Sequence, residues 1–158
     1  MAYNTERYDV SDACVTRFVN HTNPWREDIV RDSLAALNPL LLLVDDDWMN
    51  REILQAQLEL AGFRVVPANG GEQALELARD HDLSLVLLDI RMGGMDGYSV
   101  CAALKSHAAT AHIPVILMTA YISADAERRA ASAGAAGILL KPFDTLGLSQ
   151  KLNTFLHE

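Results

Sequence analysis

Residues 40–50 read LLLLVDDDWMN, in which five apolar residues are followed directly by Asp45, Asp46 and Asp47. An uninterrupted apolar run of this length is typical of a strand buried on both faces, as in a parallel sheet. Carboxylates placed this close together repel one another unless a cation neutralises them. The stretch therefore predicts a buried strand that ends at a charged site.

The same alternation of short apolar runs and longer amphipathic segments continues to the end of the chain. We expect strands at 40–44, 63–68, 83–88, 114–118 and 137–140. We expect helices at 50–61, 72–79, 98–107, 123–133 and 146–156, the first with Ile53, Leu54 and Leu58 on its apolar face and the fourth with Ser123 as its N-cap. Five strands alternating with five helices predict an α/β fold, a doubly wound five-stranded parallel sheet.

Composition narrows the classes of function. The 158 residues include 13 Lys+Arg and 21 Asp+Glu, a formal net charge of -8, which argues against nucleic acid as a partner. No apolar run approaches membrane-spanning length, and no signal peptide is recognisable. Cys14 and Cys101 form no metal-binding pattern. We expect a soluble cytoplasmic protein without membrane or nucleic-acid partners.

Polar residues follow four of the predicted strands directly. They are the acidic triplet, Asp89, Thr119 and Lys141. In a doubly wound sheet the carboxyl ends of the strands share one edge, where ligands bind. Clustered carboxylates suit Mg²⁺, a hard dication that prefers oxygen ligands. For the triplet alone, helix capping is an equally good explanation, and Asp47 in particular is expected to act as a cap.

Four motifs in this order resemble the receiver domain of two-component response regulators. The similarity runs from Leu40 to the C-terminus and rests on VDDD at 44–47, LLDIRMGGMDGY at 87–98, ILMTAY at 116–121 and LLKPF at 139–143. It implies a flavodoxin-like strand order, 2-1-3-4-5. No G-x-G-x-x-G is present, so a dinucleotide-binding fold is excluded.

The resemblance implies that Asp89 is a phosphoacceptor and that Mg²⁺ is the cofactor. Asp46 would bind the ion directly, and Asp45 directly or through a water. The main-chain carbonyl of Arg91 would be a further ligand.

Two more residues would complete the catalytic set. Thr119 would donate a hydrogen bond to a phosphoryl oxygen, and Lys141 would pair with Asp89 or with the phosphoryl group. The Lys141–Pro142 bond resembles one that is usually cis in the family.

Two residues around the site are expected to tune the lifetime of the phosphoryl group, and two others differ from the residues usual in the family. Arg91 and Tyr121 match positions that flank the attacking water, so we expect a long-lived phosphoryl group unless both side chains lie idle in solvent. Ala120 is small, which would leave access. Gly93 stands where proline is usual, which makes the loop more flexible. Ile138 stands at the aromatic switch position, so output is expected through another element.

The resulting hypothesis is a single-domain response regulator that takes a phosphoryl group from a histidine kinase or histidine phosphotransfer protein. It would be a self-catalysing phosphoacceptor rather than a turnover enzyme, acting on a downstream protein target or as a homodimer. A pseudo-receiver that binds without phosphorylation is the alternative. A haloacid-dehalogenase-type phosphohydrolase using Asp45 and Asp47 is a weaker one, because Met49 departs from its motif and Asp89 is left without a role.

Residues 1–38 form an extension ahead of the receiver domain, 39–158. Apolar spacing predicts a helix at 10–19 and another at 25–37, so the extension is expected to be partly helical. It would dock on the receiver or on a partner, dimerise, or serve as a linker.

Overall fold

The computed structural model describes residues 4–10, 13–19 and 38–157. The chain divides into two compact units, Met1–Leu37 and Asn38–Glu158. The second unit holds the whole αβ alternation and is described first.

The larger unit is built on a five-stranded parallel sheet. Its strands are β3 (Leu40–Val44), β4 (Arg64–Ala68), β5 (Leu85–Asp89), β6 (Val115–Thr119) and β7 (Gly137–Leu140). Their order in the sheet is β4-β3-β5-β6-β7. Counted within this sheet alone, that is 2-1-3-4-5, so the predicted fold class and strand order are confirmed.

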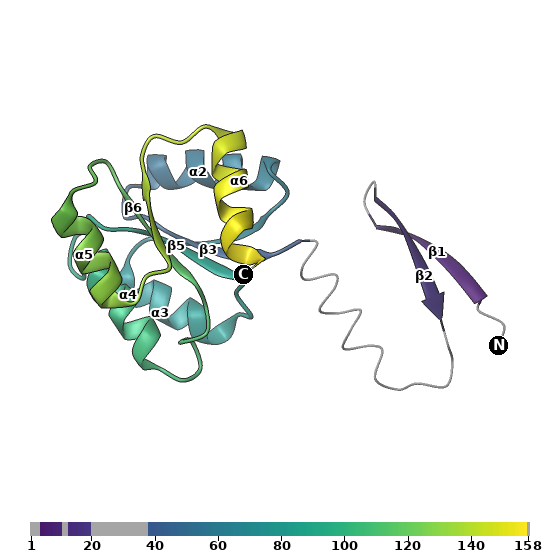
Figure 1. The fold of residues 1–158 in the computed structure, drawn as a ribbon, viewed down its shortest axis with the longest axis horizontal. Coiled ribbons are helices and arrows are strands. Elements are labelled where there is room, and N and C mark those ends of the chain that lie inside the picture. Colours follow the sequence, from purple (N-terminus) through teal and green to yellow (C-terminus); the bar gives the residue numbers. More distant parts are fainter. Residues whose placement is uncertain (1–3, 11–12, 20–37, 158) are drawn as a thin grey trace. The chain divides into compact units, whose positions relative to one another are not determined.

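Five helices cover the two faces of the sheet. They are α2 (Trp48–Leu60), α3 (Gly71–Asp80), α4 (Gly97–Ser106), α5 (Ala124–Ala133) and α6 (Thr145–Leu156). Figure 1 shows α2 and α6 on one face and α3, α4 and α5 on the other. Ser123 caps α5 as predicted, because its side chain accepts a hydrogen bond from the Ala126 N–H.

The two-sided cover explains the uninterrupted apolar strands. Successive strand residues point to opposite faces. Leu41 and Leu43 accordingly pack with α2 and α6, while Leu42 and Val44 pack with the other three helices. Both pairs of residues are fully buried, so a polar side chain at any of these alternating positions would be buried as well. The edge strand β4 is less buried and carries Pro67, which an edge strand tolerates because one side makes no ladder hydrogen bonds.

The predicted apolar face of the first helix is partly wrong. Leu54 and Leu58 of α2 are buried, but Ile53 is 56% exposed. Consecutive helical residues are rotated by about 100°, so Ile53 lies to the side of the stripe that faces the sheet. Ile53 is therefore not part of the face that packs on the sheet.

The predicted helix at 10–19 is wrong. Strands β1 (Asn4–Val10) and β2 (Ala13–Val19) pair as an antiparallel hairpin in which Val10 lies opposite Ala13. Apolar residues four apart suit a helix, but four is also a multiple of the strand period. The β-branched and aromatic residues of VTRFV at 15–19 favour the strand. The second predicted helix, 25–37, lies outside the described residues.

Within the described residues, no helix combines the length and apolar character needed to cross a membrane.

Candidate functional site

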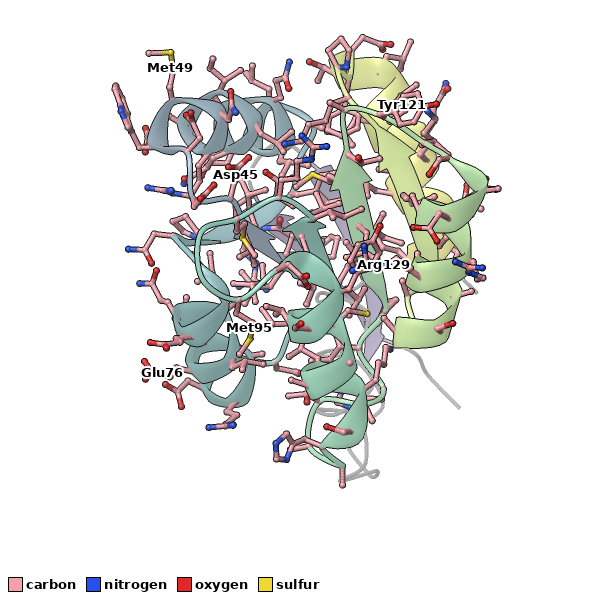
Figure 2. All side chains as sticks on the ribbon, turned by 90° about the vertical axis from the view of Figure 1, so that its left-hand side faces the viewer. Asp45, Met49, Glu76, Met95, Tyr121 and Arg129 are labelled. Carbon is pink, nitrogen blue, oxygen red and sulfur yellow. The ribbon has the colours of Figure 1, made fainter. Side chains whose placement is uncertain are left out.

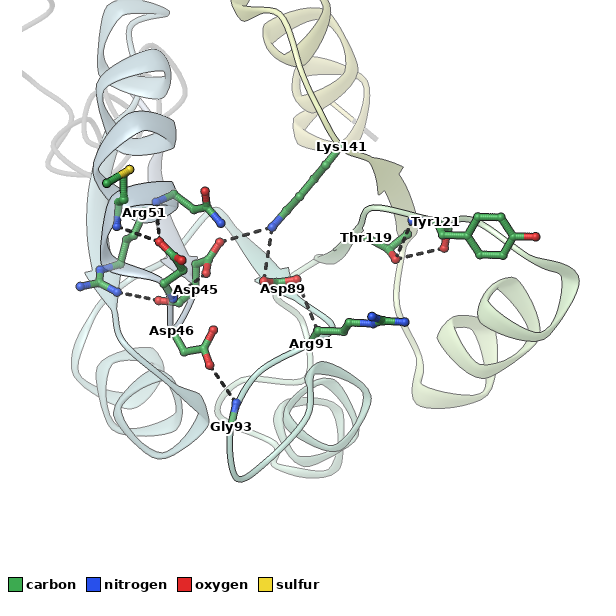
Figure 3. Close-up of polar contacts among 12 residues, drawn as sticks. Asp45, Asp46, Arg51, Asp89, Arg91, Gly93, Thr119, Tyr121 and Lys141 are labelled. Atoms are coloured by element: carbon green, nitrogen blue, oxygen red, sulfur yellow. Dashed lines mark hydrogen bonds and ion pairs between the residues drawn. The ribbon is translucent and has the colours of Figure 1, made fainter.

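Strand register brings the predicted polar residues to one edge of the sheet. Asp89 is the last residue of β5 and pairs with Met118, and Thr119 ends β6 and pairs with Leu140. Asp45 follows β3 and Lys141 follows β7. Figure 3 shows Asp45, Asp89 and Lys141 meeting at the ends of their strands, with Thr119 bonded to Tyr121 at the end of β6.

Three carboxylates form a compact cluster at this edge. One oxygen each from Asp45, Asp46 and Asp89 lies within 4.8 Å of the others. Asp45 is 1% and Asp89 9% exposed, whereas Asp46 faces solvent. An all-oxygen donor set of this spacing suits a hard divalent cation such as Mg²⁺.

Lys141 bridges the two buried carboxylates. Its Nζ lies 3.3 Å from Asp45 Oδ2 and 3.3 Å from Asp89 Oδ2. The Lys141 N–H also donates to the Thr119 carbonyl at 2.7 Å, which joins the ends of β6 and β7. The Lys141–Pro142 bond is cis. Sequence reasoning paired Lys141 with Asp89 and missed its second partner, Asp45.

The three adjacent acids have three different environments, which answers why they can stand side by side. Asp45 Oδ1 accepts the Asp47 N–H at 2.9 Å. Asp46 Oδ2 accepts the Gly93 N–H at 2.8 Å. Asp47 Oδ1 accepts two main-chain N–H groups in the first turn of α2, so its expected role as a cap is confirmed. Asp47 is thereby engaged at the helix, which weakens the dehalogenase-type alternative.

Asp89 has a perturbed titration. Burial, as the largest effect, raises the pKa of the Asp89 carboxyl; Lys141 lowers it and Asp45 raises it. The Arg91 N–H donates weakly to Asp89 Oδ1 at 3.4 Å and favours the ionised form. The net rise in pKa means that ionising Asp89 costs more in the folded protein than in water, and a cation in the cluster would offset that cost.

The hydroxyl of Thr119 is bonded locally. Its Oγ1 donates to the Tyr121 carbonyl at 3.0 Å and accepts the Tyr121 N–H at 3.2 Å. This geometry closes a tight turn after β6 and engages the hydroxyl's proton with the Tyr121 carbonyl. A ligand beside Asp89 would have to compete with the Tyr121 carbonyl for that proton.

A cleft of about 660 Å³ runs beside Thr119. Its lining includes Asp46, Arg91, Ala120 and Tyr121. Tyr121 is 74% exposed, and Arg91 extends from the Asp89 loop toward the same side of the site (Figure 3). Ala120, a small residue, lines the same cleft, and its role in access stays a prediction.

Ile138 lies within β7, half-buried, and packs against the core formed with α3, α4 and α5. It pairs in the sheet with Leu117, two residues before Thr119. An aliphatic side chain packed in this way has no ring to reorient. The expectation that output uses another element stays a prediction.

Sequence reasoning missed two groups at the acidic edge. Arg51 Nη1 donates to the Asp45 carbonyl at 2.7 Å and supports the loop after β3. An arginine in the first turn of the helix after the acids was the available signal. Gly93 was noted for flexibility, but its N–H turns out to contact Asp46.

Comparison with known proteins identifies the domain. The model of the response regulator receiver domain matches residues 41–153. The chain is 46% identical over 104 residues to the transcriptional regulatory protein ZraR of Klebsiella oxytoca, covering 66% of this chain and 23% of that protein. It is 36% identical over 114 residues to the response regulator PleD of Caulobacter vibrioides, covering 72% and 25%. The chain thus spans about a quarter of these relatives.

Solved structures give the same result over their whole length. Chemotaxis protein CheY4 of Vibrio cholerae superposes with a TM-score of 0.72 at 26% identity, over 75% of this chain and 98% of that one. The receiver domain of sensor histidine kinase PA1611 from Pseudomonas aeruginosa has a TM-score of 0.71 at 27% identity, over 77% and 99%. That structure holds a magnesium ion in its active-site cleft. Sequence, fold and site agree: the chain belongs to the response regulator receiver domain family of two-component systems.

Proposed function

We propose that this receiver accepts a phosphoryl group on Asp89 in a Mg²⁺-dependent reaction and acts as a phosphorylation-dependent switch. The donor would be a phosphohistidine on a kinase or phosphotransfer protein, and the output a cytoplasmic protein–protein interaction. The net charge of -8 does not favour nucleic acid as a direct target.

The charge balance of the cluster carries the proposal. When ionised, the three carboxylates exceed the charge of the Lys141 ammonium by two negative charges at the edge of the sheet. A divalent cation matches that charge, and the oxygen donors match its chemistry. Asp45, Asp46, Asp89 and the Arg91 carbonyl would hold the ion. When bound, Mg²⁺ would neutralise charge on the phosphoryl oxygens.

Asp89 would act as the nucleophile in the transfer. A carboxylate oxygen of Asp89 attacks phosphorus, the P–N bond of the phosphohistidine breaks, and the imidazole leaves with the bond's electron pair. Lys141, already 3.3 Å from Asp89, would pair with a phosphoryl oxygen as charge develops. Phosphoryl transfer depends mainly on such positioning and charge neutralisation.

Thr119 would join the site as the phosphoryl group arrives on Asp89. Its hydroxyl would exchange the Tyr121 carbonyl for a phosphoryl oxygen, a stronger acceptor because it is charged. That exchange would loosen the turn after β6 and link phosphorylation to the start of α5. Ile138 has no aromatic ring that could move when the Thr119 hydroxyl changes partner. We therefore propose that the turn after β6 carries the conformational response to phosphorylation.

Hydrolysis would reset the switch. Water attacks phosphorus, the P–O bond to Asp89 breaks, and inorganic phosphate leaves with the carboxylate regenerated. Arg91 and Tyr121 border the cleft through which that water would come. We propose that their bulk slows its approach.

The phosphodonor would dock over the start of α2. Trp48 and Met49 are 64% and 54% exposed and directly follow the acidic triplet, and Figure 2 shows Met49 projecting away from the domain. Exposed apolar side chains beside a site mark an interaction surface. Replacing both by alanine should slow transfer from a phosphohistidine protein but not from acetyl phosphate. L146A, which changes a 70%-exposed leucine on α6, is the control.

The decisive test is a phosphate-affinity gel of the protein after incubation with acetyl phosphate, with and without Mg²⁺. We expect a Mg²⁺-dependent shifted band that D89N abolishes and D47N retains, because asparagine is an equivalent helix cap. A shifted band that persists in D89N would overturn Asp89 as the acceptor. No band in a folded, Mg²⁺-bound wild type would favour the pseudo-receiver.

A further inference from the structure

The loops that follow β3 and β5 are joined by one hydrogen bond between residues 47 positions apart. The Gly93 N–H donates to Asp46 Oδ2 at 2.8 Å (Figure 3). Asp46 faces solvent, so packing does not hold its carboxylate in place as it holds the buried Asp45. Among the described residues, the Gly93 N–H is the hydrogen-bond donor that the Asp46 carboxylate contacts.

We propose that the main-chain N–H of Gly93 is a positioning donor for the cation site. A carboxylate offers two oxygens with about four lone pairs. By occupying Oδ2 of Asp46, Gly93 would restrict rotation of the carboxylate and leave its other oxygen for the ion. Partners of this outer kind fix the orientation of metal ligands. The inference rests on the magnesium site of the proposed function and adds a residue to it.

The chemistry of position 93 provides a matched pair of variants. Every residue except proline supplies a main-chain N–H. The backbone of Gly93 lies outside the left-handed region, unlike that of Gly94, whose φ is 78°. A Cβ built on Gly93 would lie 3.7 Å from Asp46 Oδ2, an ordinary van der Waals contact. Alanine should therefore preserve the hydrogen bond, and proline alone removes the donor.

The contact itself can be tested without metal. Amide exchange of Gly93, measured by NMR in EDTA on the full chain, should be about tenfold faster in D46A than in wild type, because the acceptor is lost. D47N should leave the Gly93 rate unchanged, since Asp47 accepts from α2 instead. Equal Gly93 exchange in wild type and D46A would overturn the inference, whatever happens to variants at position 93.

The consequence is tested by calorimetric titration of Mg²⁺ into wild type, G93A and G93P, with no phosphodonor present. G93A should bind Mg²⁺ as wild type does. G93P should bind about tenfold more weakly, the lower end of what loss of an outer partner costs a metal site. Equal affinity of G93A and G93P would overturn the role of Gly93 and leave the proposed function intact. A wild type that binds no Mg²⁺ would overturn the proposed site itself.

Discussion

The two sides of the site are held together in opposite ways. On the acidic side, formed by Asp45, Asp46, Asp89 and Lys141, contacts join loops far apart in the chain: Lys141 reaches Asp45 across 96 residues. On the hydroxyl side, formed by Thr119, Ala120 and Tyr121, the hydrogen bonds of the Thr119 hydroxyl lie within two residues. The acidic side is thus preassembled for charge, whereas the hydroxyl side must break a local bond before it can act.

This difference predicts that the rate of phosphorylation depends more on the acidic side than on the hydroxyl side. Preorganised groups stabilise developing charge without a reorganisation cost. A group that first gives up a hydrogen bond contributes only the difference between the two bonds.

The largest effect is expected from K141Q. Loss of the ammonium removes the cation between Asp45 and Asp89 and should slow phosphorylation by acetyl phosphate about 100-fold. The measurement is the initial rate of the shifted band at saturating Mg²⁺. K151Q, which neutralises an exposed lysine on α6, should match wild type. A K141Q rate within a few-fold of wild type would contradict the prediction that phosphorylation depends more on the acidic side than on the hydroxyl side.

T119A should have a smaller effect. The rate of phosphorylation should fall about tenfold, because exchanging the Tyr121 carbonyl for a charged phosphoryl oxygen gains only the difference between the two hydrogen bonds. T119S keeps the hydroxyl and should restore most of the rate. If T119A proves as slow as K141Q, the hydroxyl side is preassembled after all and its bond to the Tyr121 carbonyl is not the resting state.

Y121A should affect only the rate of dephosphorylation. Removing the exposed ring should shorten the lifetime of the phosphoryl group by roughly two- to five-fold, less than the loss of one hydrogen bond would. The decay of the shifted band after removal of the donor measures it. Y121F should decay as wild type does if bulk is the cause. Unchanged decay in Y121A would assign no tuning role to this side chain.

The smallest effect concerns stability and pH. Because the folded-state pKa of Asp89 is raised, its ionised form disfavours folding: the cost is present above the folded pKa and vanishes below the unfolded value, about 3.9. Metal-free D89N should therefore unfold at a higher temperature than wild type at pH 7, and the gain should shrink as the pH approaches 4. Thermal unfolding in EDTA measures it.

The control for that series is D82N, an exposed change outside the cluster, whose difference from wild type should be small at both pH values. A D89N protein that is less stable than wild type at pH 7 would mean that Asp89's pairing with Lys141 outweighs its burial and the repulsion from Asp45.

Much of the fold was determined by the sequence alone. Strands with both parities apolar, such as Leu41 to Val44, have no stable placement except between two layers of helices. The helix caps at Asp47 and Ser123 were equally readable, because capping is a contact within three residues. The hairpin of β1 and β2 could not be read from the sequence, because apolar residues spaced four apart fit both the helical and the strand period.

Only the tertiary structure decided how the site is held. That Asp45, Asp89 and Lys141 lie at the ends of strands could be read from the chain, and parallel strands bring such ends to one edge. Which oxygen meets which donor could not, because Lys141 and Asp45, or Gly93 and Asp46, meet only after separate loops take up one orientation. Residue type sets the charge of each group, and the packing of the strands sets its partner.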